Sequence, residues 1–178
     1  IGMVMISQYD IEYNSEKGIL IKSHEKSVCP ICGGKLSVRD SRKRICYHED
    51  GTRKKYRLRR LKCKQCTKIH MELPDFMQPF KRYEAKVVEA VLDDKGRSCP
   101  AEECTIRRWK DWFCSRTALF EAKLRSLKQR LEGSPDNILC PSSLLLEIRS
   151  TGIGWLSRLT RQLVNSENEI HTCFAFCH

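Results

Sequence analysis

The chain has 178 residues and carries 33 Lys and Arg against 22 Asp and Glu, a formal net charge of +11 with a pI near 9.2. No stretch approaches the roughly 18 apolar residues of a membrane span, and the first residues lack the basic flank of a signal peptide. Eleven cysteines, an odd number, favour a reducing compartment with metal over a disulfide framework. We therefore expect a cytoplasmic protein.

Residues 1–28 contain two short apolar runs, 3–6 and 19–21, around the turn-like segment 14–18. This pattern predicts short strands or a small hairpin beside the region that follows.

Two Cys-x-x-Cys pairs, Cys29 with Cys32 and Cys63 with Cys66, are the strongest motif in the chain. Each pair places two thiolates on one tight turn, and four thiolates match the tetrahedral preference of Zn²⁺. A closed set of four sulfurs leaves no position for a reactive water, so the predicted zinc is single and structural. The alternative is four reduced cysteines without metal.

Between the pairs, residues 36–47 and 52–61 predict the two arms of a β-hairpin, joined through the turn residues 49–51. A β-hairpin flanked by two Cys-x-x-Cys turns, or zinc knuckles, is the arrangement found in a zinc ribbon. We expect an α+β chain: this small N-terminal ribbon, then a helical region with a helix-turn-helix-like unit. The expected domains are residues 1–28 (short strands or hairpin), 29–82 (zinc ribbon and linker), 83–133 (helix-turn-helix-like helices) and 134–178 (a C-terminal helical tail).

The positive charge is concentrated in residues 29–82, which hold 16 Lys and Arg against 5 Asp and Glu. This segregation favours a polyanionic partner, because each neutralised phosphate releases counterions. A solvated domain surface is the alternative. The candidate phosphate-binding residues of the hairpin are Arg42, Lys43, Arg44, Arg53, Lys54, Lys55, Arg57, Arg59 and Arg60.

Residues 67–83, rich in proline and aromatic residues, predict an extended linker. His70 is a possible metal ligand, but four cysteines already close the site. Cys46 and His48 are expected to be ordinary strand and turn residues.

Apolar residues at helical spacing predict helices over about 83–92, 104–113 and 117–131. In the second helix, Ile106, Trp109 and Phe113 share one face. This pattern is typical of a recognition helix, and it predicts base contacts by the polar residues Thr105, Arg107, Arg108 and Lys110. A core helix whose charged residues face solvent would show the same pattern.

Further helices are expected at 144–148 and 153–164 after a linker at 133–137. The last eight residues contain His171, Cys173, Cys177 and His178, whose role as a second metal site is the weaker interpretation.

Four segments occur in order: Cys-Pro-Ile-Cys-Gly-Gly-Lys-Leu, Arg-Leu-Arg-Arg-Leu-Lys-Cys-Lys-Gln-Cys, Ile-His-Met-Glu-Leu-Pro-Asp-Phe and Thr-Ile-Arg-Arg-Trp-Lys-Asp-Trp-Phe. Over most of residues 29–113 the chain resembles a bacterial family of uncharacterised zinc-ribbon plus helix-turn-helix proteins, itself similar to the N-terminal DNA-binding parts of transposases. The resemblance implies DNA binding in a mobile-element setting, and so a bacterial protein that is cytoplasmic and nucleoid-associated. The segment 99–103 departs from it, being too short for a full helix of a standard helix-turn-helix.

We therefore expect a protein that binds double-stranded DNA without being an enzyme: an accessory or regulatory factor of a mobile element, with a transposase or recombinase as a possible partner. One alternative is a transposase-derived nuclease or recombinase component, for which the chain beyond residue 83 offers too few residues. Another is a zinc-ribbon module that binds RNA or protein.

Overall fold

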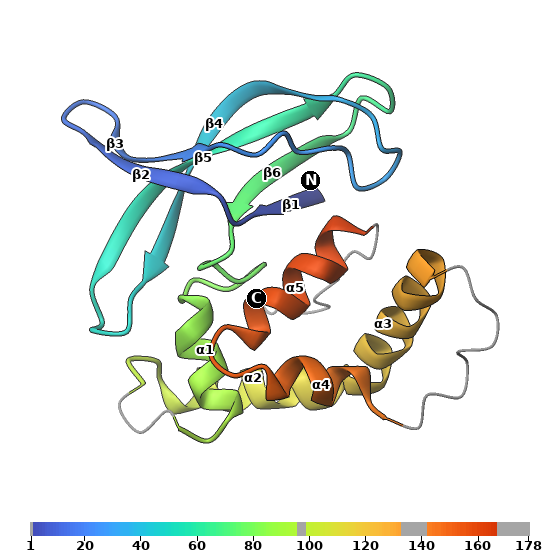
Figure 1. Ribbon diagram of the computed structural model, residues 1–178. Coiled ribbons are helices and arrows are strands. Elements are labelled where there is room, and N and C mark those ends of the chain that lie inside the picture. Colours follow the sequence, from blue (N-terminus) through green and yellow to red (C-terminus); the bar gives the residue numbers. More distant parts are fainter. Residues whose placement is uncertain (1, 96–98, 133–141, 167–178) are drawn as a thin grey trace.

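The computed structural model describes residues 2–95, 99–132 and 142–166, with a strongly curved sheet on one side and a layer of helices on the other (Figure 1). The strands are β1 (Gly2–Ile6), β2 (Tyr9–Asn14), β3 (Gly18–Ser23), β4 (Leu36–Tyr47), β5 (Arg53–Cys63) and β6 (Ile69–Pro74). The helices are α1 (Ala85–Leu92), α2 (Glu103–Cys114), α3 (Thr117–Glu132), α4 (Leu144–Ser150) and α5 (Trp155–Asn165).

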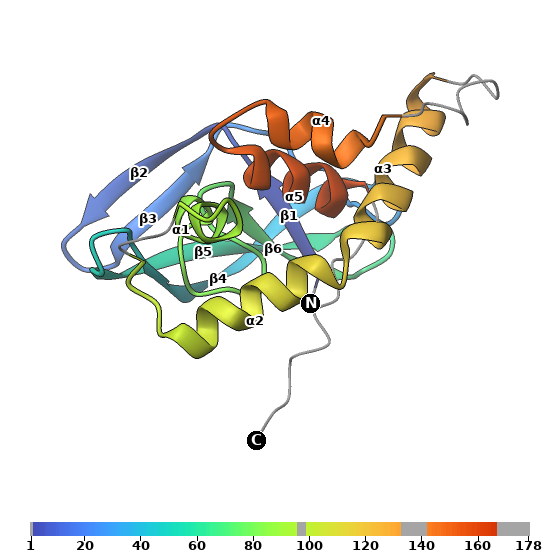
Figure 2. The same ribbon diagram turned by 90° about the horizontal axis from the view of Figure 1, so that it is seen from below.

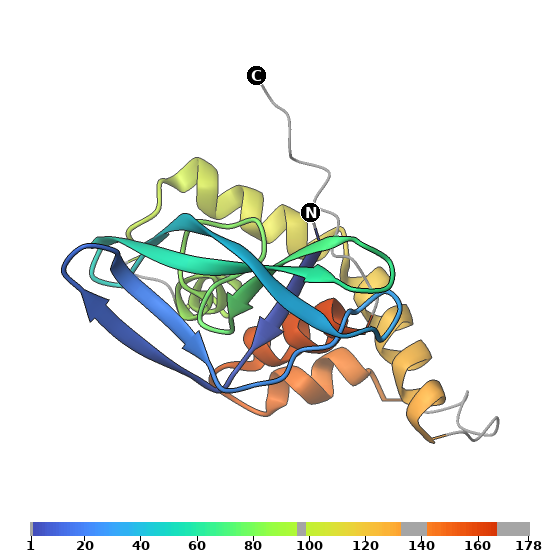
Figure 3. The ribbon, with the colours of Figure 1, turned by 90° about the horizontal axis from the view of Figure 1, so that it is seen from above.

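Strand β5 is the centre of the sheet. One edge pairs with β4 antiparallel along nearly the whole strand, and Figure 3 shows the two as a long twisted hairpin. The other edge is shared: its first half pairs with β3 in parallel and its second half with β6 antiparallel. The β2–β3 hairpin extends the sheet on one side, and β1 pairs with β6 in parallel on the other.

The expectation of a small, simple zinc ribbon is wrong, although the chain is α+β. The hairpin arms lie where the sequence places them, yet they belong to a mixed six-stranded sheet. The physical reason is burial: Leu58 is 0% and Tyr56 4% exposed, and a lone two-stranded hairpin cannot cover such side chains. Residues 69–74, expected as linker, supply the missing strand β6.

The N-terminal hairpin is also displaced from its expected position. It consists of β2 and β3 around the turn at 14–18, whereas the apolar run at 3–6 forms β1 at the far end of the sheet. Because both β1 and β6 carry runs of apolar residues, each covers part of the core that the hairpin alone would leave open.

The core lies between the concave face of the sheet and the helices, which Figure 2 shows from below. Ile6, Leu58 and Leu73 from the strands and Leu156 and Leu159 from α5 are all 0% exposed and belong to one hydrophobic cluster. Asn165 fastens the end of α5 to β1, accepting from the Met5 N–H (2.7 Å) and donating to its carbonyl (2.8 Å).

The predicted helices are present, but they do not stand apart as a helix-turn-helix-like unit. The buried side of α2 consists of Trp109, Trp112 and Phe113, and these belong to the same hydrophobic cluster as the inner face of the sheet. A row of aromatic rings connects α2 to the hairpin. The ring centroids of Trp109 and Tyr83 are 5.0 Å apart, and those of Tyr83 and Tyr47 of β4 are 5.1 Å apart. Helices and sheet therefore stabilise each other.

Two sequence expectations lie outside the described residues: the linker at 133–137 and the ligand candidates at 171–178.

Candidate metal centre and basic surface

The four predicted cysteines come together at one end of the β4–β5 hairpin, which we call the cysteine end. Their Sγ atoms all lie within 4.8 Å of one another, with Cys29 3.6 Å from Cys66 and Cys32 3.5 Å from Cys63. A tetrahedral zinc with bonds of about 2.3 Å separates its sulfurs by about 3.8 Å. The four thiols are therefore compatible with one metal ion, and they form the only such group among the described residues.

Each cysteine pair sits on a tight backbone turn. Gly33 has φ +68°, a conformation that side chains disfavour, and its N–H donates to the Cys29 carbonyl at 2.9 Å. The second turn is closed by the Cys63 N–H, which donates to Lys68. The two turns pack closely: a Cβ atom added at Gly34 would lie 3.0 Å from the Cys63 sulfur. Glycine at both positions lets the two knuckles meet.

Hydrogen bonds at the cysteine end favour the thiolate form of Cys63. Burial by itself would raise the pKa of Cys63, but the N–H groups of Cys66 and Gln65 and the thiols of Cys32 and Cys66 lower it to about 6. A thiolate is the form that binds a metal ion, so the polypeptide prepares this ligand before the ion arrives.

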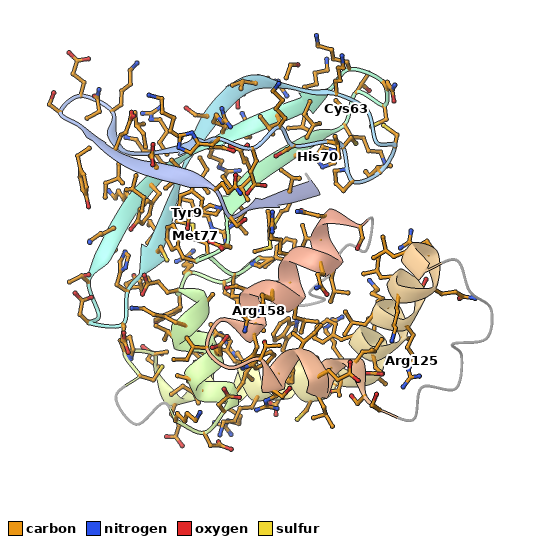
Figure 4. The ribbon with its side chains drawn as sticks, viewed as in Figure 1. Tyr9, Cys63, His70, Met77, Arg125 and Arg158 are labelled. Carbon is orange, nitrogen blue, oxygen red and sulfur yellow. The ribbon has the colours of Figure 1, made fainter. Side chains whose placement is uncertain are left out.

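His70 is a further residue of the centre. It is 1% exposed, and its Nε2 lies 3.3 Å from the Cys29 sulfur. Figure 4 shows His70 beside Cys63, on neighbouring strands β6 and β5. Metal-binding sulfurs are commonly oriented by such outer hydrogen-bond donors. The sequence could not assign this contact, because it depends on the pairing of His70 with Leu61 in a strand that was expected to be linker.

The basic residues of the hairpin divide into two groups, and the first is bound within the protein. Arg44 donates from Nη2 to the carbonyls of Gln78 (2.8 Å) and Lys81 (2.9 Å). Arg59 makes a two-point ion pair with Glu72, which is 2% exposed, at 2.7 and 2.9 Å.

Arg60 pairs in the same way with Asp40, and its hydrogen bond lowers the pKa of that carboxyl group. Arg44, Arg59 and Arg60 thus have structural partners that the sequence did not reveal.

The second group has no carboxylate partner among the described residues. Pairing across β4 and β5 places Lys43 opposite Arg57 and Ser41 opposite Arg59, on the outer face of the sheet. Arg57 donates only to a hydroxyl and a backbone carbonyl. We call this group the basic surface; it consists of Lys43, Arg53, Lys55 and Arg57 on the outer face, together with Arg42 and Lys54, which the register places on the opposite face of the same two strands.

On α2 the predicted polar face is partly as expected. Arg107 and Arg108 are exposed and have no ion pair within the described ranges, whereas Lys110 pairs with Asp94. Thr105 is half-buried. The segment before α2 lies close to the hairpin turn, since a Cβ on Gly51 would be 3.7 Å from Pro100.

Comparisons with known proteins identify one similarity. A family model described as a domain of unknown function (DUF6431) matches residues 29–109, which run from the first cysteine to the middle of α2. No curated protein and no solved structure matches the chain. Among the described residues, no helix has the length and apolar character to cross a membrane.

Proposed function

We propose that the protein binds double-stranded DNA through the basic surface, and that the four thiolates hold one structural Zn²⁺. The observation that carries the proposal is the group of six basic side chains on β4 and β5 without a carboxylate partner in the described part of the chain. Cations brought close together repel one another, and a polyanion relieves that repulsion while releasing its own counterions.

The assignment of zinc rests on the ligand chemistry. Four cysteine sulfurs are soft ligands, and a tetrahedral set of them suits Zn²⁺. When bound, the ion would tie the loop before β4 to the end of β5, and so would fix the hairpin that carries the basic surface. With all four positions taken by protein, its role is to support folding.

The exposed arginines of α2 supply a second contact in this proposal. The basic surface would hold phosphates without reading sequence, while Arg107 and Arg108 approach base edges. Because Pro100, three residues before α2, lies near the hairpin turn, we infer that one duplex reaches both the basic surface and α2. The resemblance to transposase DNA-binding parts favours an accessory or regulatory factor of a mobile element as the setting, with a transposase or recombinase as partner.

The test measures binding of a fluorescent duplex at several salt concentrations. The variant Arg42→Ala/Lys43→Ala/Lys55→Ala removes three charges from the basic surface, and Lys26→Ala/Lys95→Ala/Lys128→Ala removes three elsewhere. Each lost phosphate contact should reduce the log–log salt slope by roughly 0.9. The first variant should therefore bind weakly with a flatter slope, and the second should resemble the wild type.

Equal slopes for the two variants would contradict the proposal. A structured RNA that displaces the duplex at lower concentration would assign the basic surface to RNA instead.

A further inference from the structure

Two cations lie together at a place that the proposed DNA contacts do not use. Lys81 belongs to the segment between β6 and α1, and its Nζ lies 3.9 Å from the centre of the Trp112 ring on α2. Arg116, one helical turn beyond Trp112, is close enough to affect it: burial and then the charge of Arg116 lower the pKa of Lys81 to about 8. Both side chains are half-buried.

The donors of this cluster have no acceptor. Arg116 Nε and Trp112 Nε1 are shielded from solvent and have no hydrogen-bond partner among the described residues. No described carboxylate forms an ion pair with either Lys81 or Arg116. Buried cations in proteins are normally paired, and buried N–H groups normally donate, because an unmet donor in a low-dielectric interior is unfavourable. An anion is the missing partner.

The backbone around Lys81 is held firmly in place. Arg44 from β4 donates to the carbonyls of Gln78 and Lys81, and the Gln78 side chain reaches Thr160 of α5 at 3.4 Å. Between them Phe80 has φ +60°, a conformation that is unfavourable for a residue with a side chain. Such strain persists only where surrounding contacts enforce it, and it is concentrated at binding sites.

Stabilisation by the protein alone does not account for the cluster. The ring of Trp112 attracts the Lys81 ammonium, but it offers nothing to Arg116 Nε or to its own N–H. The carbonyl of Trp112 at the end of α2 already accepts from Ser115 Oγ, and that of Phe113 accepts from Thr117 Oγ1.

We propose that Lys81 and Arg116 bind a phosphate group, with the indole N–H of Trp112 as a third donor. Phosphate oxygens are numerous and strongly accepting, and guanidinium and ammonium groups are their usual partners. The phosphate belongs either to a nucleic-acid backbone or to a free anion. Only the nucleic-acid source depends on the proposed function.

The primary experiment uses inorganic phosphate and the full chain labelled with ¹⁵N. Phosphate is titrated against chloride at constant ionic strength, and the indole signal of Trp112, assigned with Trp112→Phe, is followed together with the Arg116 Nε–H. We expect saturable shifts in the wild type and in the control Lys95→Met. In Lys81→Met and Arg116→Gln the affinity should fall at least tenfold. Shifts equal to those in chloride would overturn the proposal.

Thermal melts separate binding from a structural role. Because Lys81→Met removes an uncompensated cation, its Tm in chloride should exceed that of the wild type. Phosphate should raise the Tm of the wild type and of the control Lys95→Met, but not that of Lys81→Met. If Lys81 serves only to pack on Trp112, the variant melts lower and phosphate has no effect on either protein, which contradicts the proposal. Arg116→Gln repeats the test at a second residue.

A short duplex then identifies the source of the phosphate. If the duplex shifts the Trp112 and Arg116 signals in the same way as inorganic phosphate does, and inorganic phosphate reverses its effect, the site binds a nucleic-acid backbone. Shifts with inorganic phosphate alone assign it to a free anion, and no shift with either probe contradicts the proposal. The inorganic titration does not involve the basic surface, so a failure of DNA binding there leaves its result unchanged.

Discussion

The two ends of the β4–β5 hairpin are held in different ways. At the cysteine end, four sulfurs lie within 4.8 Å of one another, with Cys29 and Cys63 buried and Cys32 exposed. At the turn end, the Tyr47 ring stacks on that of Tyr83. The His48 ring hydrogen-bonds through Nε2 to the Tyr56 hydroxyl (2.9 Å), and its Nδ1 lies 2.7 Å from the Glu84 carboxylate. We propose that an ion stabilises the cysteine end, whereas the turn end relies on protein contacts, so the two ends should fail under different conditions.

The largest expected effect is the loss of the metal. Purified protein should contain one zinc per chain, and Cys63→Ser or a strong chelator should remove it, because ligands and fold form together in such sites. Hydrogen exchange should then rise sharply in the turns at 29–34 and 63–68 and much less in α5. Cys46→Ser, at a cysteine outside the centre, should retain the zinc. A folded protein without any metal in elemental analysis would refute this.

The turn end should instead respond to loss of an aromatic ring. Trp109 is 5% exposed and contacts Tyr83. Trp109→Ala should lower the free energy of unfolding by roughly 3–5 kcal/mol, as expected for a large buried ring, while zinc remains bound. Urea denaturation with parallel zinc analysis measures both quantities. Loss of zinc in this variant would show that the two ends are not independent.

A smaller effect is expected between the ends, at the ion pair of Arg59 and the buried Glu72. Arg59→Ala leaves a carboxylate without its partner, whereas Arg57→Ala does not. Breaking a buried pair costs roughly 3–5 kcal/mol; the partial exposure of Arg59 should reduce this to about 2 kcal/mol. Urea denaturation of the two variants gives the comparison, and equal stabilities would mean that Glu72 finds another partner.

The smallest effect on stability is expected for the exposed arginines of α2. Arg107→Ala and Arg108→Ala should each change the free energy of unfolding by less than about 0.5 kcal/mol. If these side chains read bases, each variant should relax preference at one or two positions, equivalent to about 1–3 kcal/mol of discrimination. Selection of bound sequences from a random DNA pool measures this. Unchanged preferences would leave the hairpin as the sequence reader.

Much of the local structure could be predicted from the sequence. The cysteine pairs, both hairpin arms and the helices follow from spacing and periodicity, which depend on neighbouring residues only. The partners of the strands could not be predicted in this way. Residues 69–74 were predicted as linker because the segment 67–83 is rich in proline and aromatic residues. In the structure, Ile69 and Met71 pair with β5, and Gly2 to Ile6 pair with β6.

The same distinction applies to the candidate site. Sequence placed Arg59 and Arg60 in the basic group because both lie on one charged strand, whereas Glu72 and Asp40, which neutralise them, come from other strands. His70 and the cluster of Lys81 with Arg116 were missed for the same reason. The net charge of a segment does not tell which of its charged residues are already paired within the protein. Tertiary contacts decide which charges remain available to a partner.

The pairing of β1 with β6 and of Met5 with Asn165 has a consequence for how the chain is made. The second residue of the chain lies beside residue 70, and the fifth is held by residue 165. At synthesis rates of 5–20 residues per second, the first strand therefore waits on the order of ten seconds for its last partner to appear. During that time Val4, Met5 and Ile6 have no cover from α5, and this strand needs protection from aggregation until α5 has been made.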